Sequence, residues 1–400
     1  MATPAANNSH GHVRFISLRY DNADSRRSAL RLVLTLLPQW AVDEPHIDLV
    51  RFTDGITNTL LKAVNRRPGL SETDMERDAV LLRAYGNGTD VLIDRDREAA
   101  NHELLMRHGL APELLARFAN GMLYRFIPGV VAQPKDLCNV QIMTAVARHL
   151  AQWHATVPCL PDAPTGAAVG HVERAKIVNA APGKPFPNTW TTMQKWILAL
   201  PATTDAQRQR RDVLQRELDE LIGSLSQRPG LGEHGLVFAH CDLLSANVII
   251  HGDGGDATKV SFIDYEYGTP SPVAFDLANH FAEWAGYDCD YAAVPTRAQR
   301  LGFIREYIKT YAWLSGAEMR EEDEVERLMD QVDAFRGVPG FYWGIWSLIQ
   351  ATISFIKFDY AAYAEARLGE YWAYKAEQDG SREAAGKEMP LREKMWARGE

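Results

Sequence analysis

The sequence predicts an α+β protein of two lobes, a small N-terminal lobe built on an antiparallel sheet and a larger, mainly helical C-terminal lobe. Three observations predict this. Strand patterns and turn residues crowd residues 47–127, helical periodicity dominates beyond Pro128-Gly129, and a polar loop between two short apolar strands interrupts the helical part near residue 240. A chain of 400 residues with 46% hydrophobic content can bury the cores of two such lobes.

The N-terminal lobe is predicted to span residues 21–128, after a disordered N-terminus at 1–20. Asp24 and Ser25 begin a helix whose leucines recur at helical spacing. Further along, a helix is predicted at 98–108, and strands are predicted at 47–53, 57–64, 79–85, 114–118 and 122–127. The last two strands form a hairpin across Asn120-Gly121.

The C-terminal lobe is predicted to span residues 129–378. Helices are predicted at 137–156, 189–200, 206–226, 274–285 and 297–314, and in a long aromatic-rich run at 325–374. The segment from Pro158 to Pro187 is rich in proline, glycine and alanine and is predicted to be a surface excursion. Residues 379–400 are highly charged and are predicted to form a loosely ordered tail.

The loop between the two short strands carries the residue types that phosphoryl transfer requires. Asp242 and Asn247 lie on this loop, and Asp264 ends the second strand, which would aim its carboxylate back at the same point. Phosphoryl transfer needs a carboxylate that receives or orients the proton of the acceptor hydroxyl, together with oxygen ligands for Mg²⁺. We interpret Asp242 as the base, Asn247 and Asp264 as metal ligands, and His240 as a residue that braces the catalytic loop.

The residues of this loop have two other interpretations. A single Asp or Asn after a strand is usually a turn former, but these three residues in this order favour catalysis. A zinc site at His240, Cys241 and Asp242 is disfavoured, because adjacent side chains of an extended segment point to opposite faces. No second His or Cys group at ligand spacing supports zinc either.

The N-terminal lobe offers residues for a nucleotide. The first strand turn consists of Asp54, Gly55, Ile56, Thr57 and Asn58. Its glycine would let backbone amides approach phosphate oxygens. The alternative is a plain hairpin turn, which has the same pattern. Arg83 is a lone cation on the strand 79–85, and Glu98 follows on the next helix. A strand cation held by a helix carboxylate contacts the α- and β-phosphates in protein kinases. The alternative for Arg83 is a solvent-facing side chain. Together the lobes predict a bilobal protein-kinase-like fold with nucleotide between them.

Composition excludes several other classes. The net charge of −9 provides no basic field for a nucleic acid. The four cysteines are scattered without a CxxC pair, so neither a disulfide framework nor a zinc ribbon is predicted. The N-terminus lacks the apolar core of a signal peptide, and no apolar run approaches the ~20 residues of a membrane span. The sequence therefore predicts a cytoplasmic protein that is not integral to a membrane, and it is compatible with a homodimer.

The chain resembles the choline/ethanolamine kinase family, and within it the ethanolamine kinases most closely. The resemblance covers roughly residues 47–375 and is carried by ordered blocks, which are Asp54 to Asn58, Tyr85 to Arg95, His240-x-Asp242-x4-Asn247, Phe262 to Tyr267, Phe275 to Phe281 and Trp343 to Gln350. It implies ATP-dependent, Mg²⁺-dependent phosphorylation of ethanolamine, the first step of the CDP-ethanolamine route to phosphatidylethanolamine. Choline kinase or dual activity is the alternative.

The resemblance also implies roles for individual residues. Asp242 matches the base, Asn247 and Asp264 the Mg²⁺ ligands, and Arg83 the phosphate-contacting cation. The segment from Asp54 to Leu60 matches the phosphate loop, and the segment that borders the adenine site contains Arg125, Phe126 and Ile127. The chain departs from the family at Cys241, where Asn is usual, and at Thr269-Pro270-Ser271-Pro272, where an Asn-Tyr pair is more usual.

The acceptor's cation is placed by the resemblance among one carboxylate and five aromatic side chains, which are Glu283, Tyr287, Trp343, Trp346, Tyr360 and Tyr363. Cation–π contacts contribute ~0.5–2 kcal/mol each. Without the resemblance, aromatic pairs at helical spacing would be interpreted as core, and Asp276 as the cap of the helix that begins there. An ammonium with N–H donors needs acceptors and choline needs an aromatic cage. Glu283 with its small neighbours, and the block from Gly86 to Arg95, favour ethanolamine.

Other function classes remain. A non-catalytic ATP-binding scaffold would have no need of Asp242, Asn247 and Asp264 together. A protein kinase would need a long activation segment after Asp264, whereas Tyr267 is followed almost directly by a helix. The sequence leaves open the preference between ethanolamine and choline, the oligomeric state, regulation, kinetic constants, and the roles of the excursion and the tail.

Overall fold

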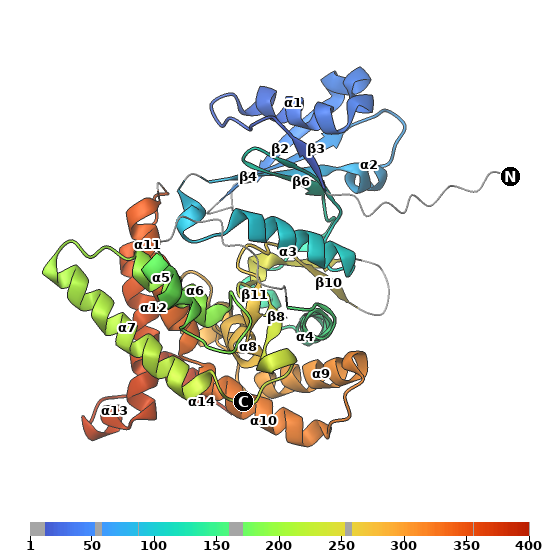
Figure 1. The fold of residues 1–400 in the computed structure, drawn as a ribbon. Helices are drawn as coiled ribbons and strands as arrows, with labels where there is room; N and C mark the ends of the chain where they lie inside the picture. Colours follow the sequence, from blue (N-terminus) through green and yellow to red (C-terminus); the bar gives the residue numbers. More distant parts are fainter. Residues whose placement is uncertain are drawn as a thin grey trace. The chain divides into compact units, whose positions relative to one another are not determined.

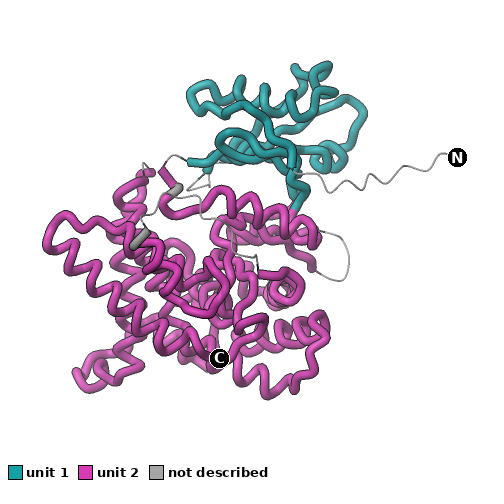
Figure 2. Tube along the Cα trace, in the orientation of Figure 1, with its two compact units in different colours: residues 1–87, 112–128 teal, residues 88–111, 129–400 magenta. Residues whose placement is uncertain are grey.

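A computed structural model describes residues 13–52, 58–86, 88–159, 171–252, 258–354 and 356–399 (Figure 1). These residues form two compact units (Figure 2). The first unit holds the described residues up to Gly86 together with Pro112–Pro128, and the second holds Gly88–Ala111 and the described residues from Gly129 onward. The predicted boundary near Pro128 therefore recurs, but residues 88–111, which the sequence assigned to the N-terminal lobe, belong to the second unit.

The first unit is a six-stranded sheet with the order β1-β5-β6-β4-β3-β2. All neighbouring strands are antiparallel except β1 and β5, which are parallel. The strands are β1 (Arg14–Ile16), β2 (Ile47–Phe52), β3 (Asn58–Asn65), β4 (Val80–Tyr85), β5 (Leu114–Phe118) and β6 (Gly121–Arg125). The helices are α1 (Ser25–Leu36) and α2 (Glu72–Asp78).

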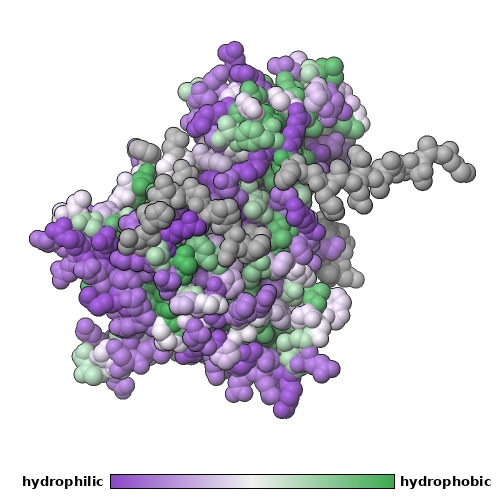
Figure 3. All heavy atoms as spheres, viewed as in Figure 1, coloured by the Kyte–Doolittle hydropathy of each residue, from purple (hydrophilic) through white to green (hydrophobic). Residues whose placement is uncertain are grey.

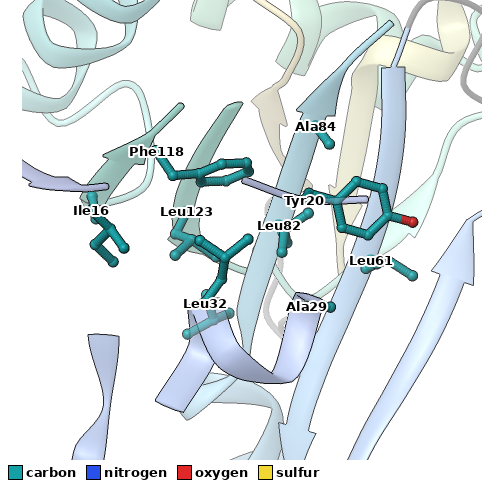
Figure 4. Packing of buried hydrophobic residues seen from close by; sticks show 11 residues of the cluster. Ile16, Tyr20, Ala29, Leu32, Leu61, Leu82, Ala84, Phe118 and Leu123 are labelled. Carbon is teal, nitrogen blue, oxygen red and sulfur yellow. The ribbon is translucent and has the colours of Figure 1, made fainter. Parts of the chain in front are cut away.

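The core of the first unit lies between α1 and the sheet (Figure 4). Ala29 and Leu32 of α1 face Leu61, Leu82 and Leu123 of three adjacent strands, and all five side chains are buried. Asp24 precedes α1 as predicted, but its side chain makes no capping hydrogen bond. The helix is therefore held mainly by its apolar face, as is usual for a helix of this length.

The prediction of disorder at residues 1–20 is wrong for the part that the structure describes. Arg14–Ile16 form β1, Ile16 and Tyr20 are buried in the same core, and Tyr20 exchanges two backbone hydrogen bonds with the side chain of Asn120 at 2.9 and 3.1 Å. The strand is short, and its partner β5 lies far along the chain. A local hydrophobic pattern could not reveal this pairing.

The second unit is mainly helical. Its longer helices are α3 (Arg95–Arg107), α4 (Val140–Thr156), α6 (Thr189–Ala199), α7 (Asp205–Leu225), α8 (Val273–Ala282), α9 (Arg297–Ser315), α10 (Glu321–Phe335), α11 (Val338–Ile353) and α12 (Tyr360–Gln378). The helix α7 buries one leucine-rich face and leaves a hydrophilic outer face (Figure 3). No helix in the described part of the chain has both the length and the apolar character that crossing a bilayer requires.

Two small sheets lie within this helical unit. One contains β10 (Lys259–Phe262), β9 (Val248–His251) and β7 (Val130–Val131), in that order, and the other pairs β11 (Thr269–Ser271) with β8 (Val237–Ala239). The sequence predicted two short strands around the polar loop, and the structure has three, β8 before the loop and the pair β9–β10 after it. These strands fix the ends of the loop.

The C-terminal region differs from the prediction in two ways. The predicted helical run 325–374 is three helices, because α10 ends at Phe335, α11 begins after Gly337 with Pro339 in its first turn, and α12 begins at Tyr360. The predicted loose tail instead contains α13 (Ser381–Ala384) and α14 (Leu391–Ala397), with Trp396 only 4% exposed. Charged side chains of α14 are buried in ion pairs, so composition alone gave the wrong expectation. The short helix α5 (His171–Val178) lies in the predicted excursion, of which residues 160–170 are not described.

Candidate active site

The polar loop begins directly after β8 and ends in the single turn Ser245–Asn247 before β9. Within it the side-chain amide of Asn247 donates to the backbone oxygen of Asp242 at 2.7 Å and to its carboxylate Oδ2 at 3.2 Å. The structure thus brings Asp242 and Asn247 together, as the spacing predicted. Because the amide nitrogen is used in this way, the amide oxygen of Asn247 is the atom left for a ligand.

Asp264 returns to the same loop through the pairing of β9 with β10. Val248 pairs with Phe262, and the backbone N–H of Ile263 donates to the carbonyl of Asn247 at 3.0 Å. Asp264 itself has a φ of 66°, a left-handed conformation that costs a non-glycine residue roughly 1 kcal/mol or more. Such a conformation persists only where surrounding contacts impose it, and it is common at functional sites.

Negative charge is concentrated around Asp242. Burial raises the pKa of Asp242 well above its usual value, and the carboxylates of Asp264, Glu283 and Glu266 raise it further, while the hydrogen bond from Asn247 acts in the opposite direction. Three further carboxylates therefore act on Asp242. Glu266 and Glu283 are buried, whereas Asp242 and Asp264 are half-buried. Such a group is stabilised by cations, whether an ammonium or a metal.

Asp276 of α8 anchors the loop. Its carboxylate accepts hydrogen bonds from the backbone N–H groups of His240 at 3.1 Å and Cys241 at 2.7 Å, and it contacts His154 Nε2 at 3.0 Å. The interpretation of Asp276 as a helix cap is wrong, because Pro272 occupies the cap position and the carboxylate points to the loop. Although burial acts to raise the pKa of Asp276, the hydrogen bond and charge of His154 hold it below its usual value.

His240 braces the loop, as predicted. Its Nε2 lies 3.0 Å from the carbonyl of Ile263, which ties the start of the loop to the residue before Asp264. Burial lowers the pKa of His240 to about 4, so the imidazole is neutral at pH 7. Cys241 is fully buried with a φ of 62°, and its backbone is what contacts Asp276. The departure from the family's usual Asn therefore leaves this contact in place.

A second anchor joins the loop to α11, and the sequence did not predict it. Asn279 Nδ2 donates to the carbonyl of Cys241 at 3.1 Å, and Asn279 Oδ1 accepts from Trp343 Nε1 at 2.8 Å. His280 Nδ1 lies 2.8 Å from the carbonyl of Leu243. Asn279 and His280 belong to a sequence block in which only Asp276 was considered. Their buried polar character on an otherwise apolar helix was the available signal.

The aromatic residues that were predicted around the acceptor form two groups of ring contacts, which Phe358 joins into one cluster. Ring centroids lie 5.6 Å apart for Trp343 and Trp346, 5.8 Å for Trp346 and Tyr360, and 6.1 Å for Tyr287 and Tyr363. Tyr287 is 45% exposed, whereas the other four are each below 9%. The cluster is thus buried except at Tyr287, which is exposed. This arrangement is compatible with a binding pocket and also with the edge of a hydrophobic core.

Two further aromatic residues, Tyr267 and Phe358, belong to this cluster and were not predicted. The hydroxyl of Tyr267 accepts from Trp346 Nε1 at 2.7 Å, and its ring lies 5.5 Å from that of Trp343. Phe358 packs against Tyr287, Tyr360 and Tyr363. Tyr267 follows Asp264 closely in the sequence, and this proximity was the signal that could have identified it.

Glu283 lies in the turn after α8 and is 6% exposed. Its Oε1 accepts from Arg367 Nη2 at 2.8 Å, so the carboxylate predicted for the acceptor's cation already has a guanidinium partner. Burial raises the pKa of Glu283, and the positive charge of Arg367 opposes that rise. Arg367 was not predicted, because nothing in the sequence of α12 indicates which of its faces meets Glu283.

The residues predicted to bind nucleotide are placed only in part. Asp54, Gly55, Ile56 and Thr57 lie outside the described residues, and Asn58 begins β3 opposite Tyr85. Arg83 lies in the middle of β4 and is 4% exposed, which contradicts the alternative of a solvent-facing arginine.

The segment predicted to border the adenine follows β6. Arg125 Nη1 donates to the carbonyl of Asp78 at 3.0 Å, and its Nε lies 3.3 Å from the carboxylate of Glu113. The Phe126 ring stacks on Phe52 with centroids 6.4 Å apart and has Lys62 Nζ 4.0 Å from its centre. Ile127 comes next and is half-buried.

Glu98 of α3 is buried and pairs with Arg95, with 2.8 Å between carboxylate Oε2 and guanidinium Nη1. The same nitrogen of Arg95 lies 3.3 Å from Glu266 Oε2. This arrangement connects α3 to the segment just after Asp264. The predicted pair between Arg83 and Glu98 stays a prediction.

The protein has a sheet unit and a helical unit, and the helical unit carries a braced His-x-Asp loop with an Asn and a second Asp beside it. These features define the kinase-like phosphotransferase class. The family model described as choline/ethanolamine kinase matches residues 49–372. The chain belongs to the choline/ethanolamine kinase family.

Named relatives agree with this membership. Human ethanolamine kinase 1 is 36% identical over 364 residues, which cover 88% of this chain and 72% of the relative. Mouse ethanolamine kinase 2 is 33% identical over 364 residues, covering 90% of this chain and 84% of the relative.

Solved structures share the fold. The ethanolamine kinase of Plasmodium vivax superposes with a TM-score of 0.68 at 24% identity, covering 88% of this chain and 89% of that one. A choline kinase of Cryptosporidium parvum gives a TM-score of 0.64 at 20% identity, covering 92% and 99%. The predicted fold class is confirmed.

Proposed function

We propose that the protein transfers the γ-phosphate of ATP to the hydroxyl of ethanolamine, forming phosphoethanolamine at the first step of the CDP-ethanolamine route. The observation that carries the proposal is the group of carboxylates around Asp242, beside an aromatic cluster that is exposed at Tyr287. A small cation that bears a hydroxyl satisfies both features. The ethanolamine kinases among the relatives support the same substrate. We also propose a cytoplasmic location, supported by the scattered cysteines, all of which are unpaired.

In the proposed reaction Asp242 acts on the acceptor hydroxyl. Its raised pKa suits a group that must take up a proton, and its bond to Asn247 fixes the orientation of its carboxylate. As the alcohol oxygen forms its bond to the γ-phosphorus, the bond from phosphorus to the bridging oxygen of ADP breaks. The hydroxyl proton moves to Asp242. The positive charge of the ammonium, held by the aromatic rings, keeps the hydroxyl near this carboxylate.

Asn247 and Asp264 are the proposed ligands of Mg²⁺. An amide oxygen and a carboxylate are hard oxygen donors of the kind Mg²⁺ prefers, and the amide orientation of Asn247 leaves its oxygen available. Within the described ranges no group of three His, Cys, Asp or Glu side chains could hold a metal alone. That suits Mg²⁺, which is commonly held by one or two protein groups and the phosphates of the substrate. Bound there, it would neutralise phosphate charge.

The nucleotide is proposed to be ATP. The choline kinase LicA of Streptococcus pneumoniae was solved in complex with AMP, and that structure gives a TM-score of 0.53 at 14% identity. In this chain we assign the phosphates to Arg83 and Asn58, with Glu98 as the carboxylate partner of Arg83, and the adenine to the segment Arg125 to Ile127.

We expect kcat/KM to be higher for ethanolamine than for choline with Mg²⁺-ATP. The ammonium of ethanolamine carries three N–H donors that carboxylates can accept, whereas the trimethylammonium of choline has none. A coupled assay of ADP release with both alcohols measures the ratio, and a reaction without alcohol gives the background. Equal or reversed efficiencies would instead assign a dual or choline kinase activity, which the aromatic cluster would also serve.

We expect Trp346→Phe to raise the KM for the alcohol about 2- to 30-fold, the range of one weakened cation–π contact of ~0.5–2 kcal/mol. The KM for ATP should change little. Trp190→Phe is the matched control, because Trp190 is also buried but its ring packs against Phe335, outside the cluster. Both variants should lose some thermal stability, since both leave a cavity. If the alcohol KM is normal in Trp346→Phe, Trp346 is core and the same doubt falls on Trp343.

A further inference from the structure

A chain of alternately charged side chains runs from the C-terminal helix α14 to Glu283. In α14, Glu393 Oε1 lies 3.1 Å from Arg392 Nη1, and Arg392 Nε lies 3.5 Å from Glu370 Oε2 of α12. On the same helix α12, Glu370 Oε1 lies 3.5 Å from Arg367 Nε. Arg367 Nη2 then donates to Glu283 Oε1 at 2.8 Å. We call these five residues the ionic chain.

Every member of the ionic chain is buried. Side-chain exposure is 1% for Arg367, 3% for Arg392 and Glu393, 4% for Glu370 and 7% for Glu283. A buried charge is costly unless a partner of opposite sign compensates it, and removing one partner leaves the other uncompensated. The charge and position of each member therefore depend on its neighbours in the chain.

Arg367 connects the ionic chain to two residues of the proposed acceptor site. Besides Glu283, it reaches the hydroxyl of Tyr363 through Nη1 at 3.3 Å. Glu283 and Tyr363 are side chains that the acceptor's cation would meet, whereas the buried Arg367 approaches them from within α12.

We propose that Arg367 is a positioning residue for the acceptor site and that Glu370 and Arg392 extend this positioning to α14. The proposal rests on the proposed function. Arg367 fixes one oxygen of Glu283 and places a positive charge beside the carboxylate, so that its other oxygen can accept from the ammonium. The guanidinium of Arg392 shares the charge of Glu370. Without Arg392, Glu370 would draw Arg367 toward itself and away from Glu283.

The first test compares single and double variants of the pair. Arg367→Met should raise the KM for ethanolamine about 10-fold and leave the KM for ATP unchanged, while Arg367→Lys should have a smaller effect because it keeps the charge. Glu283→Gln should raise the same KM to a similar extent. The double variant Glu283→Gln with Arg367→Met should raise it no further, because Arg367 acts through Glu283. It should also fold, since both charges are removed together.

The second test concerns the remote end of the ionic chain. Arg392→Met should raise the KM for ethanolamine about 3-fold without changing the KM for ATP. Lys394→Met is the matched control on α14, because Lys394 is exposed and pairs only at the surface with Glu388. Glu217→Gln is the control for loss of a buried charge, because Glu217 bonds Tyr371 and Lys375 of α12 away from Glu283. Lys394→Met should leave both KM values normal, and Glu217→Gln should lower Tm without changing either KM.

A normal ethanolamine KM in Arg367→Met, or additive effects in the double variant, would overturn the positioning role. Should Arg367→Met fail to fold, the comparison of Glu283→Gln with the double variant decides. A normal KM in Arg392→Met would remove α14 from the proposal. These outcomes are distinct from failure of the proposed function, which would show as absence of ethanolamine-dependent ADP release in the unaltered protein.

Discussion

Asp242→Asn should lower kcat by about 100-fold or more and leave ATP binding largely intact, because it removes the group that takes up the hydroxyl proton. The asparagine oxygen can still accept the hydrogen bond that Asn247 donates to the carboxylate. The loop should therefore keep its shape. Turnover is measured in the ADP-release assay and ATP affinity by equilibrium binding. Turnover close to that of the unaltered protein would show that Asp242 has only a structural role.

The pH dependence of the reaction adds a second measurement. Burial and the neighbouring carboxylates raise the pKa of Asp242, so the fraction that is deprotonated and able to act as a base falls as the pH decreases through that raised pKa. A plot of log kcat/KM against pH should therefore fall as the pH decreases. In Asp242→Asn this acidic limb should disappear from the residual activity. An unchanged limb would assign it to another group.

The substitution Asp242→Asn should affect thermal stability in the opposite direction to activity. A carboxyl group whose folded-state pKa lies above its unfolded value destabilises the folded protein increasingly as the pH rises above the unfolded pKa. For Asp242 that penalty is present at neutral pH, so Asp242→Asn should have a Tm equal to or higher than that of the unaltered protein. The gain should vanish in acid. A residue that mainly held the loop together would instead lower the Tm when replaced.

Residues whose signal is local were predicted from the sequence. The strands β2 to β6 and most long helices follow from hydrophobic periodicity and turn residues, within a few positions at their ends. Asp242, Asn247 and Asp264 were placed together because a loop and a short pair of strands leave them few other arrangements. The structure brings the loop and β10 together through the contact of Ile263 with Asn247.

Residues whose role depends on a distant partner were not predicted. Asp276 has the sequence position of a helix cap, and only the fold shows that its carboxylate meets the loop. The sequence around Arg367 and Arg392 is typical of surface arginines. Both are buried because carboxylates from other segments compensate their positive charges. The strand β1 has too few residues for a periodic pattern. In each case the partner lies far away in the sequence, where a window of neighbouring residues carries no information about it.

Asp264→Ala should reduce kcat by about 10³-fold, because it removes the carboxylate proposed to hold Mg²⁺ against the phosphates and leaves their charge without compensation. Alanine tolerates the φ of 66° at this position poorly, so a loss of activity could also come from the backbone. Asp264→Asn separates the two causes. Asparagine adopts left-handed conformations readily and keeps the shape of the side chain, so it should preserve Tm while still losing most activity.

The competing ligand for the metal is Glu266, the next carboxylate along the chain. Its Oε2 lies 3.3 Å from Arg95 Nη1, so it is already engaged in an ion pair that involves α3. Glu266→Gln should therefore lower activity far less than Asp264→Asn and should leave the Mg²⁺ concentration for half-maximal rate unchanged. A titration of activity against Mg²⁺ for both variants compares them directly. If Asp264→Asn keeps its activity and its Mg²⁺ dependence while Glu266→Gln loses them, the metal ligand is Glu266, and the left-handed turn at Asp264 serves only to direct the chain toward it.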